Sequence, residues 1–432
     1  MTSQARLEHS RHCDPCPDPA VERSDPPIRI DGTGGTSPGR RRLESTLLTA
    51  SVIVASTTFA TCVLAFLPGS SLVTLPATML VPTVAPLLLV GASAALVVLI
   101  WCRGRIAPRL ATCSAVVAAL SATLAIVIIA SRVSAIGRAG GSVNVAASLF
   151  PKVGMAGQPD SSVTYATVGG VDLHASIYEP QERLDRPAPT LVYVHGGGWI
   201  SGRPDEFGAK LRWFADQGWL VIGVEYRLST TRLHTWDQSP ADIGCALSWT
   251  GANASRFGGD ASRVIVMGDS AGGNLAINAS YAAATGKAAS SCGGTVPVPL
   301  AVVAQYPVVD PVATWNHGFG GGTESGARSM LEQYLGGTPA EYPHRYAAVS
   351  SGGFVDSSAP PTLIIEPARD HLIPSTSVDE FVDLARGAGV DVDRTTVPFA
   401  DHGYDSLAIG SIGDQGHRTI VKDYVLGVLD PD

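Results

Sequence analysis

The chain reads VIVMGDSAGGNLA from Val264 to Ala276: an apolar run, a glycine-rich turn and the start of a helix-like segment. Within the turn, Ser270 has a glycine two residues to either side, which is the spacing Gly-x-Ser-x-Gly. Between a strand and a helix, this spacing predicts a sharp turn that lifts the serine hydroxyl clear of the sheet. A Cβ at either glycine would collide with a neighbouring element. A plain turn can show the same pattern, so Ser270 is a candidate nucleophile only if other segments supply its partners.

A second glycine-rich turn lies upstream, directly after another apolar run. It reads HGGGW from His195 to Trp199. Consecutive glycines let backbone amides point at one spot, and a nucleophilic serine needs such donors for the oxyanion that forms at the carbonyl. We expect these oxyanion-hole donors to be the amides of Gly197, Gly198 and Ala271, and we place Trp199 at the substrate-binding site. A glycine turn with no chemical role is the alternative, but two such motifs in this order make it unlikely.

Two strand-like runs near the end of the chain are each followed by a polar side chain that could complete the site. Asp370 follows the run Pro361–Glu366, and His402 follows the run Val392–Val397. Serine, acid and histidine then come in the order Ser270, Asp370, His402, each on a loop after a strand. In this arrangement His402 would accept the Ser270 proton while Asp370 holds the imidazole in the required tautomer.

The acid has two rivals in the sequence. Glu366 belongs to the end of one of the two strands, and Asp401 directly precedes the candidate histidine. We favour Asp370 because it stands several residues beyond its strand, on the loop, where catalytic side chains are usually carried.

The part of the chain from residue 163 onward has the pattern of an α/β domain. Val163–Val168 and Val171–Tyr178 flank a Gly-Gly pair, which supplies the positive φ of a tight hairpin turn. After Thr190, apolar runs without polar alternation predict strands of a parallel sheet buried on both faces. The further predicted elements are helices at 207–217, 241–253 and 275–284 and strands at 220–224, 264–267 and 300–305.

This alternation stops between Pro307 and Pro360, where glycine, serine and tyrosine are frequent. We predict an insertion there with one helix, at 327–334. Long insertions in compact domains are more often functional than not, so this one is a candidate lid or pocket-lining segment.

With these motifs, residues 163–432 resemble the hormone-sensitive-lipase-like esterases of the α/β-hydrolase fold. The resemblance implies a mostly parallel sheet flanked by helices, and cleavage of carboxylic esters through the triad Ser270, Asp370 and His402 with an acyl-enzyme. It implies no metal and no organic cofactor. The chain departs from the family pattern at Ser229-Thr230, where Ala-Pro is usual, and at Ala368, where glycine is usual. The motifs that carry the resemblance are HGGGW at 195–199, EYRL at 225–228, GDSAGG at 268–273 and DHGY at 401–404.

Two other functions stay open. An amidase or peptidase could use the same triad, because amide cleavage needs the same nucleophile with stronger protonation of the leaving group. A binding module could have kept the fold and lost the chemistry. We favour the esterase or lipase, since a module of that kind usually lacks a triad member and this chain has all three.

The composition of the chain indicates a second, more apolar part besides the α/β domain. The chain has 432 residues, more than one ordinary domain needs, and only 16% of them are charged. The mean hydropathy of +0.19 is high for a soluble enzyme. A net charge of −8 argues against nucleic acid as a partner. The resemblance implies a small-molecule or lipid ester as the substrate, and the excess of apolar residues indicates a membrane.

Residues 1–44 are polar, rich in proline, and show no apolar periodicity, so we predict a disordered cytoplasmic tail. His9, His12, Cys13 and Cys16 cluster there and are possible zinc ligands by type. No core surrounds them, so we predict no metal site.

Residues 45–131 hold three apolar stretches of the length that crosses a bilayer. Ser45–Leu67 and Ala111–Ser131 contain no charged residue. The middle span is expected at Thr83–Trp101, with several prolines at its entrance, where the helix can still start. A cleaved signal peptide is the alternative for the first stretch, but it begins too far from Met1 and two more follow. We therefore predict three transmembrane helices, a linker at 132–162 and a catalytic domain at 163–432.

Basic residues give the orientation of these helices. Arg40–Arg42 precede the first helix, Arg103–Arg109 lie between the second and third, and the loop 68–82 has no charge. By the positive-inside rule, the amino terminus and the loop that carries Arg103–Arg109 lie in the cytoplasm. Three crossings then place the part of the chain after Ser131, with the catalytic domain, outside the cell membrane. An exported domain could pair Cys245 with Cys292, although Cys245 could equally be a core residue.

Overall fold

The computed structural model describes residues 37–67, 74–154, 157–181, 186–317 and 326–430. The chain divides into two units, Met1–Leu43 and Glu44–Asp432. The histidine and cysteine cluster of the tail lies outside the described residues. Helix α1 (Pro38–Leu64) begins inside the segment assigned to the tail, with a proline at its start, where the missing N–H costs nothing.

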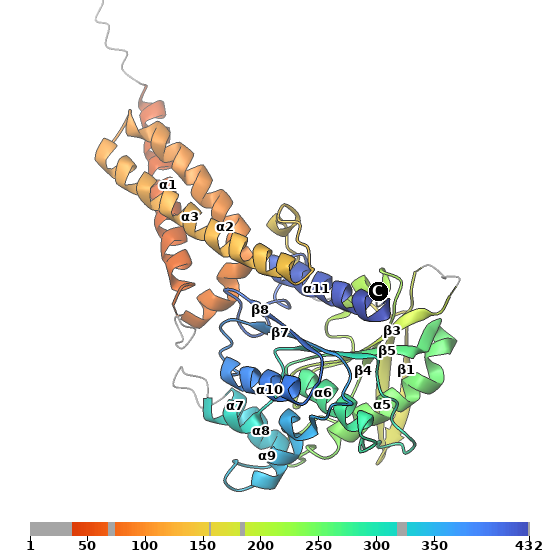
Figure 1. Ribbon diagram of the computed structural model, residues 1–432. Coiled ribbons are helices and arrows are strands. Elements are labelled where there is room, and N and C mark those ends of the chain that lie inside the picture. The colour runs from red at the N-terminus through yellow and green to blue at the C-terminus, as the bar shows by residue number, and fades with distance from the viewer. Residues whose placement is uncertain (1–36, 68–73, 155–156, 182–185, 318–325, 431–432) are drawn as a thin grey trace, which may run out of the picture. The chain divides into compact units, whose positions relative to one another are not determined.

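The larger unit contains an eight-stranded sheet in the order β1-β2-β4-β3-β5-β6-β7-β8 (Figure 1). β1 and β2 form the predicted antiparallel hairpin, with Val168 opposite Val171. From β3 onward the sheet is parallel, as the apolar runs indicated. The strands are β1 (Ser161–Val168), β2 (Val171–Tyr178), β3 (Ala188–Val194), β4 (Leu220–Val224), β5 (Gly259–Asp269), β6 (Ala301–Gln305), β7 (Thr362–Pro367) and β8 (Val392–Val397).

Both faces of this sheet are covered by helices, which explains why its strands are apolar throughout. In β5, Val264 and Val266 belong to the core on one face, while Ile265 and Met267 belong to the core on the other. Side chains alternate between faces along a strand, so an apolar run buries both. The first face packs on α5 (Ser239–Asn253), α6 (Ala271–Ala284) and α10 (Ser375–Gly387), and the second on α4 (Gly208–Ala215) and α11 (Ile412–Leu429).

The insertion between Pro307 and Pro360 is more helical than predicted. The expected helix is present as α8 (Ala327–Leu335), but α7 (Pro311–His317) and α9 (Pro343–Val349) were not predicted. Both are seven residues long, too short to show a helical period in the sequence.

In the part of the chain that the structure describes, three helices are long and apolar enough to cross a membrane: α1, α2 (Thr74–Arg103) and α3 (Pro108–Arg138). α3 runs past residue 131, into the segment assigned to the linker. Its last turns pack on α11, where a Cβ added at Gly416 would lie 2.4 Å from the Ile136 side chain. Packing against the catalytic domain, which the local sequence does not show, therefore extends the helix.

The prolines of α2 do not stand at its entrance, as we expected, because the helix starts at Thr74 and contains Pro82 and Pro86. A proline at position 86 cannot donate to the carbonyl of residue 82. That carbonyl instead accepts a hydrogen bond of 2.8 Å from Nη1 of Arg132, a fully buried side chain of α3. The neighbouring helix thus satisfies the group that the proline leaves free, as membrane helices require.

Candidate active site

Ser270 lies at the turn between β5 and α6, with φ 55° and ψ −118°. This strained conformation fits the sharp turn that the Gly-x-Ser-x-Gly spacing predicted. A Cβ at Gly268 would lie 2.2 Å from the Gly272 carbonyl oxygen, and one at Gly272 would lie 2.2 Å from the Val194 carbonyl oxygen. Only glycine fits either position, because β5, α6 and β3 approach one another at the backbone.

The structure brings the three side chains of the expected triad into one hydrogen-bonded chain. His402 Nε2 lies 3.0 Å from Ser270 Oγ, and His402 Nδ1 lies 2.8 Å from Asp370 Oδ2. The second oxygen of Asp370 accepts the amides of Leu372 and Ile373 at 2.8 and 2.9 Å. The carboxylate is therefore fixed in its loop with one oxygen aimed at the imidazole. With the Nδ1 proton held by Asp370, Nε2 is free to accept the serine proton.

The environment of His402 makes it a stronger base than an ordinary histidine. Burial lowers its pKa, but the charge and hydrogen bond of Asp370, together with the charges of Asp401 and Asp405, outweigh burial and raise the pKa above its usual value. An imidazolium at this position would thus be stabilised.

The two other acids considered in the sequence analysis, Glu366 and Asp401, have different hydrogen-bond partners. Glu366 accepts hydrogen bonds from Arg394 Nε at 2.6 Å and from the Thr396 hydroxyl at 2.9 Å. Asp401 accepts the Nδ1 proton of His371 at 2.7 Å, so it pairs with a different histidine. Among the described residues, Asp370 is the carboxylate that reaches the His402 ring.

The expected oxyanion-hole amides lie around the same serine. Gly197 and Gly198 have φ of 101° and 61°, and Ala271 is the first residue of α6, whose amide has no acceptor within the helix. No backbone carbonyl in the described part of the chain accepts a hydrogen bond from Gly197 or Gly198. A Cβ at Gly198 would lie 2.3 Å from the sulfur of Met330 in α8, so the insertion packs directly on this turn.

Two cavities meet at Ser270. The larger, of about 250 Å³, is lined by Ser270, His402, the three glycines of the upstream turn and Met330, among others. The smaller, of about 30 Å³, is lined by Ser270 and apolar side chains that include Trp199. Trp199 is buried and stacks on Tyr334 of α8, with ring centroids 4.3 Å apart. Any contact of Trp199 with a substrate would therefore be through the small cavity.

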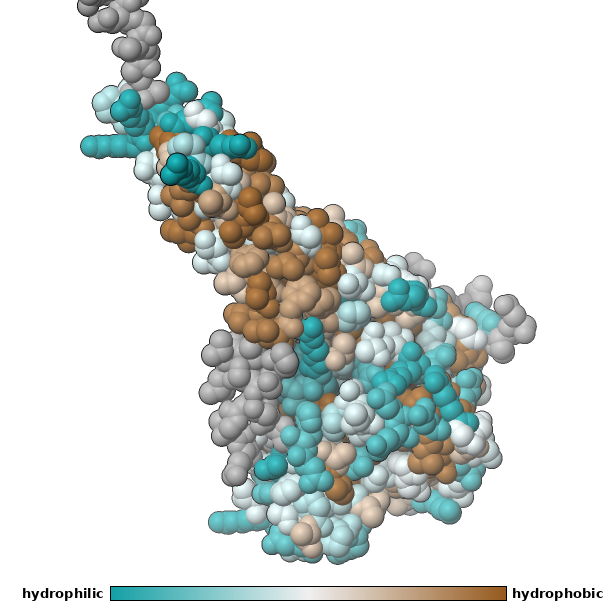
Figure 2. Space-filling view, turned by 60° about the vertical axis from the view of Figure 1, so that its left-hand side comes forward, coloured by the Kyte–Doolittle hydropathy of each residue, from teal (hydrophilic) through white to brown (hydrophobic). Residues whose placement is uncertain are grey.

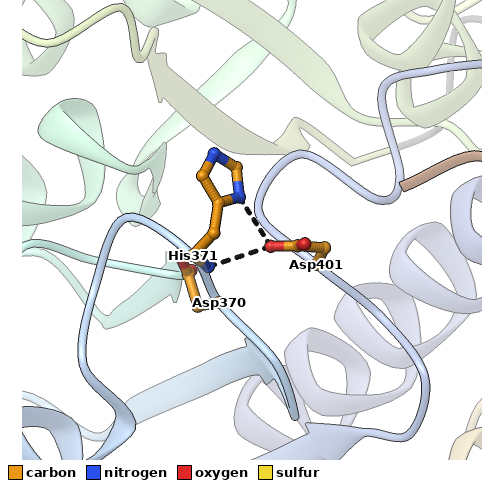
Figure 3. A group of neighbouring side chains, drawn as sticks. All are labelled: Asp370, His371 and Asp401. Carbon is orange, nitrogen blue, oxygen red and sulfur yellow. Dashed lines mark hydrogen bonds and ion pairs between the residues drawn. The ribbon is translucent and has the colours of Figure 1, made fainter. Parts of the chain in front are cut away.

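Asp370, His371 and Asp401 lie close together, each with one ligand-type atom within 4.8 Å of the others (Figure 3). Such a group could hold a cation by distance alone. One oxygen of Asp401, however, accepts three hydrogen bonds from His371 and His402, and Asp370 Oδ2 faces His402 Nδ1. These hydrogen bonds explain the cluster without an ion.

A buried ionic network lies behind the site, and the sequence analysis missed it. Lys210 of α4 pairs with Asp405, and neither side chain is exposed. Asp405 also accepts the Tyr306 hydroxyl at 2.9 Å, and the Tyr306 ring lies 4.4 Å from the His402 ring. One signal could have revealed it: Lys210 shares the apolar face of its helix with Phe214, where a lysine needs a buried partner.

Lys210→Met should destabilise the fold, because it leaves the Asp405 carboxylate buried without its cation. Loss of one partner of a buried pair costs about 3–5 kcal/mol of unfolding free energy. The midpoint of thermal unfolding in detergent measures the effect.

The matched control is Arg203→Met, which breaks the exposed pair of Arg203 with Asp205 and should leave the midpoint nearly unchanged. An unfolding midpoint for Lys210→Met equal to that of this control would contradict a stabilising role for the buried pair.

The sheet order, the serine at the turn after β5 and the helices on both faces define an α/β-hydrolase. The family model described as BD-FAE matches residues 175–383. The chain is 31% identical over 247 residues to Esterase LipC of Mycobacterium tuberculosis, covering 56% of this chain and 59% of LipC. It is 30% identical over 261 residues to Carboxylesterase NlhH of the same organism, covering 58% of this chain and 78% of NlhH. The chain belongs to the hormone-sensitive-lipase-like family of α/β-hydrolases.

A solved structure shares the fold. The apo form of Thermogutta terrifontis esterase 2 aligns with a TM-score of 0.50 and 23% identity, over 64% of this chain and 98% of the esterase. About a third of this chain has no counterpart in the esterase, which covers 64% of it. The match to LipC, in turn, spans about three fifths of the length of LipC, at 59%.

Proposed function

We propose that the protein is a membrane-anchored serine hydrolase that cleaves carboxylic esters. The observation that carries the proposal is the hydrogen-bonded chain from Ser270 through His402 to Asp370, at 3.0 and 2.8 Å. The names of the relatives, an esterase and a carboxylesterase, support the ester as the bond that is cleaved.

The first half of the reaction transfers the acyl group to the enzyme. Ser270 Oγ attacks the ester carbonyl while His402 Nε2 takes its proton, and Asp370 stabilises the imidazolium. The negative charge on the carbonyl oxygen is stabilised by the amides of Gly197, Gly198 and Ala271. As the tetrahedral intermediate collapses, the alcohol leaves with the proton from His402.

The second half releases the acid. Water enters in place of the alcohol, gives a proton to His402 and attacks the acyl-enzyme carbonyl. The same amides stabilise the second oxyanion, and Ser270 regains its proton as the acid departs.

Labelling with a fluorophosphonate tests the proposal directly. We expect one mole of label per mole of protein, attached to Ser270, with loss of ester hydrolysis in the same proportion. Ester hydrolysis that survives complete labelling, or no labelling at all, would contradict the serine mechanism.

We further propose that α1, α2 and α3 cross the cell membrane. Apolar residues gather over the helical segment on the face shown in Figure 2. Ile53, Val97 and Val116 are 56, 67 and 56% exposed, which in a soluble protein would leave a large apolar surface in water. In a bilayer these side chains would contact lipid, so the free-energy cost of exposing them to water would not arise.

The catalytic domain is proposed to lie outside the cell membrane. It contacts α2 at Thr78 and α3 at its last turns, whereas the arginines Arg103–Arg109 stand at the other ends of these two helices. Arg132 is buried and bonded to Pro82, so it does not act as a loop charge that would favour the opposite orientation. Cys245 and Cys292 pair as a disulfide with Cα atoms 5.4 Å apart, which suits an oxidising compartment.

Fusions to alkaline phosphatase, which is active only after export, test this orientation. A fusion behind residue 430 should give active cells, and a fusion behind Arg109 should not. Spheroplasts treated with external protease should lose the catalytic domain. The reverse pattern, with an inactive distal fusion and a protected domain, would place the catalytic site in the cytoplasm.

A further inference from the structure

The carboxylate of Asp401 binds donors from three separate segments of the chain. One oxygen accepts the amide and Nδ1 of His371 at 2.9 and 2.7 Å (Figure 3). The same oxygen accepts the amide of His402 at 2.8 Å. The other accepts the hydroxyl of Thr78 in α2 at 2.7 Å. His371 follows the candidate acid Asp370 directly, so this one side chain joins the acid loop, the base loop and an N-terminal helix.

This carboxylate is buried yet ionised. Asp401 is 0% exposed, and burial raises its pKa. The hydrogen bond and charge of His371, followed by the Thr78 hydroxyl, outweigh burial, so its pKa lies below the usual value. Moving a donor away would leave the buried carboxylate without a hydrogen bond, which costs free energy. The donors are therefore held in place.

Further contacts join the same helices to the same loops. The guanidinium of Arg369, next to Asp370, donates to the carbonyl of Ala65, just past the end of α1. Phe66 packs edge-on against Phe399 of the base loop, with ring centroids 4.9 Å apart. Each of the two loops thus has its own contact with the region of α1 and α2, in addition to the shared one at Asp401.

We propose that Asp401 is a positioning residue that fixes the loops of Asp370 and His402 to α2, so that the N-terminal helices form part of the catalytic framework as well as a membrane anchor. The proposal rests on the serine-hydrolase function proposed above. Asp401 touches neither the hydroxyl of Ser270 nor the ring of His402, so it acts through the placement of the triad. Misplacement of a reacting group by about 1 Å can cost up to about 10²-fold in rate.

The test uses the full chain in detergent or vesicles and measures kcat and KM for a p-nitrophenyl ester. Thr78→Val removes the hydroxyl and keeps the shape, and it should lower kcat by about tenfold with KM nearly unchanged. Thr78→Ser restores the hydroxyl and should return kcat to within about twofold of wild type. Thr83→Val is the matched control: among the described residues the Thr83 hydroxyl bonds to the carbonyl of Met79 within α2, and its loss should leave kcat unchanged.

Variants of Asp401 give two further readouts. Added to Asp401→Ala, which removes the group that Thr78 bonds to, Thr78→Val should lower kcat no further, since both changes remove the same link. The titratable groups around the His402 ring are Asp269, Tyr306, Asp370, His371, Asp401 and Asp405. Loss of the Asp401 charge should lower the pKa of His402, so the acid limb of kcat/KM should move to lower pH, which loosened packing alone would not cause.

The proposal is overturned if Thr78→Val keeps wild-type kcat while Asp401→Asn does not, because Asp401 would then act only inside the catalytic domain. Additive losses in the double variant would overturn it too. Ser270→Ala is measured alongside: if it keeps full ester hydrolysis, the proposed function fails, whichever way the Thr78 variants behave.

Discussion

Ser270→Ala should lower kcat for p-nitrophenyl esters by at least about 10³-fold while the protein stays folded. Without the hydroxyl no acyl-enzyme can form. The residual rate then comes from direct attack of water on the bound ester, assisted by the oxyanion-hole amides alone. Initial rates at saturating ester, together with the circular dichroism spectrum and the unfolding midpoint, measure both parts of this expectation.

The matched control is Ser248→Ala. The Ser248 hydroxyl bonds to the Gly244 carbonyl at 2.9 Å within α5, away from the candidate site, and its loss should leave kcat unchanged. Activity of Ser270→Ala within tenfold of wild type would remove Ser270 from the mechanism.

Asp370→Asn should lower kcat by about 10³–10⁴-fold, because an amide can donate to His402 Nδ1 and so favour the tautomer that cannot accept the serine proton. Asp401→Asn should cost far less, since its carboxylate does not touch the imidazole and acts only through placement. The measurement compares kcat of the two variants at one pH above the His402 pKa, where the wild-type base is neutral.

The opposite ranking of these two variants would move the role of the acid to Asp401. Unfolding midpoints are needed beside the rates, because both side chains also hold their loops: Asp370 accepts two backbone amides and Asp401 accepts two. A variant that has lost its fold reports nothing about the His402 tautomer. In that case Asp370→Glu, which keeps a carboxylate at this position, serves as the second test.

The sequence alone predicted the class of fold and its family, because the signals for both are local. Apolar runs without alternation mark buried parallel strands such as β5, and the glycines at 268 and 272 mark a backbone approach that admits no side chain. Family motifs then supplied Ser270, Asp370 and His402 as candidates, and the structure brings these three together. The three long apolar helices were equally visible, since crossing a bilayer needs only length and composition.

Tertiary structure decided the features that join segments far apart in the chain. Thr78 and Asp401 are separated by 323 residues, and Lys210 and Asp405 by 195. The position of Lys210 on the apolar face of α4 indicates that it needs a buried partner, but nothing local identifies Asp405, and neither Thr78 nor Asp401 gives a local signal of its contact. The same holds for Arg132, whose burial in an apolar helix makes sense only beside the carbonyl of Pro82.

The physical reason for this division is the range of the forces involved. Strand and helix periodicity, turn geometry and the length and apolar composition of a helix depend on a residue and its near neighbours, so the sequence by itself determined them for this protein. A buried charge needs a partner that only the folded chain can bring near, and no local pattern says which one. Which acid faces His402, which histidine faces Asp401 and how α2 meets the catalytic loops were therefore decided by the tertiary structure.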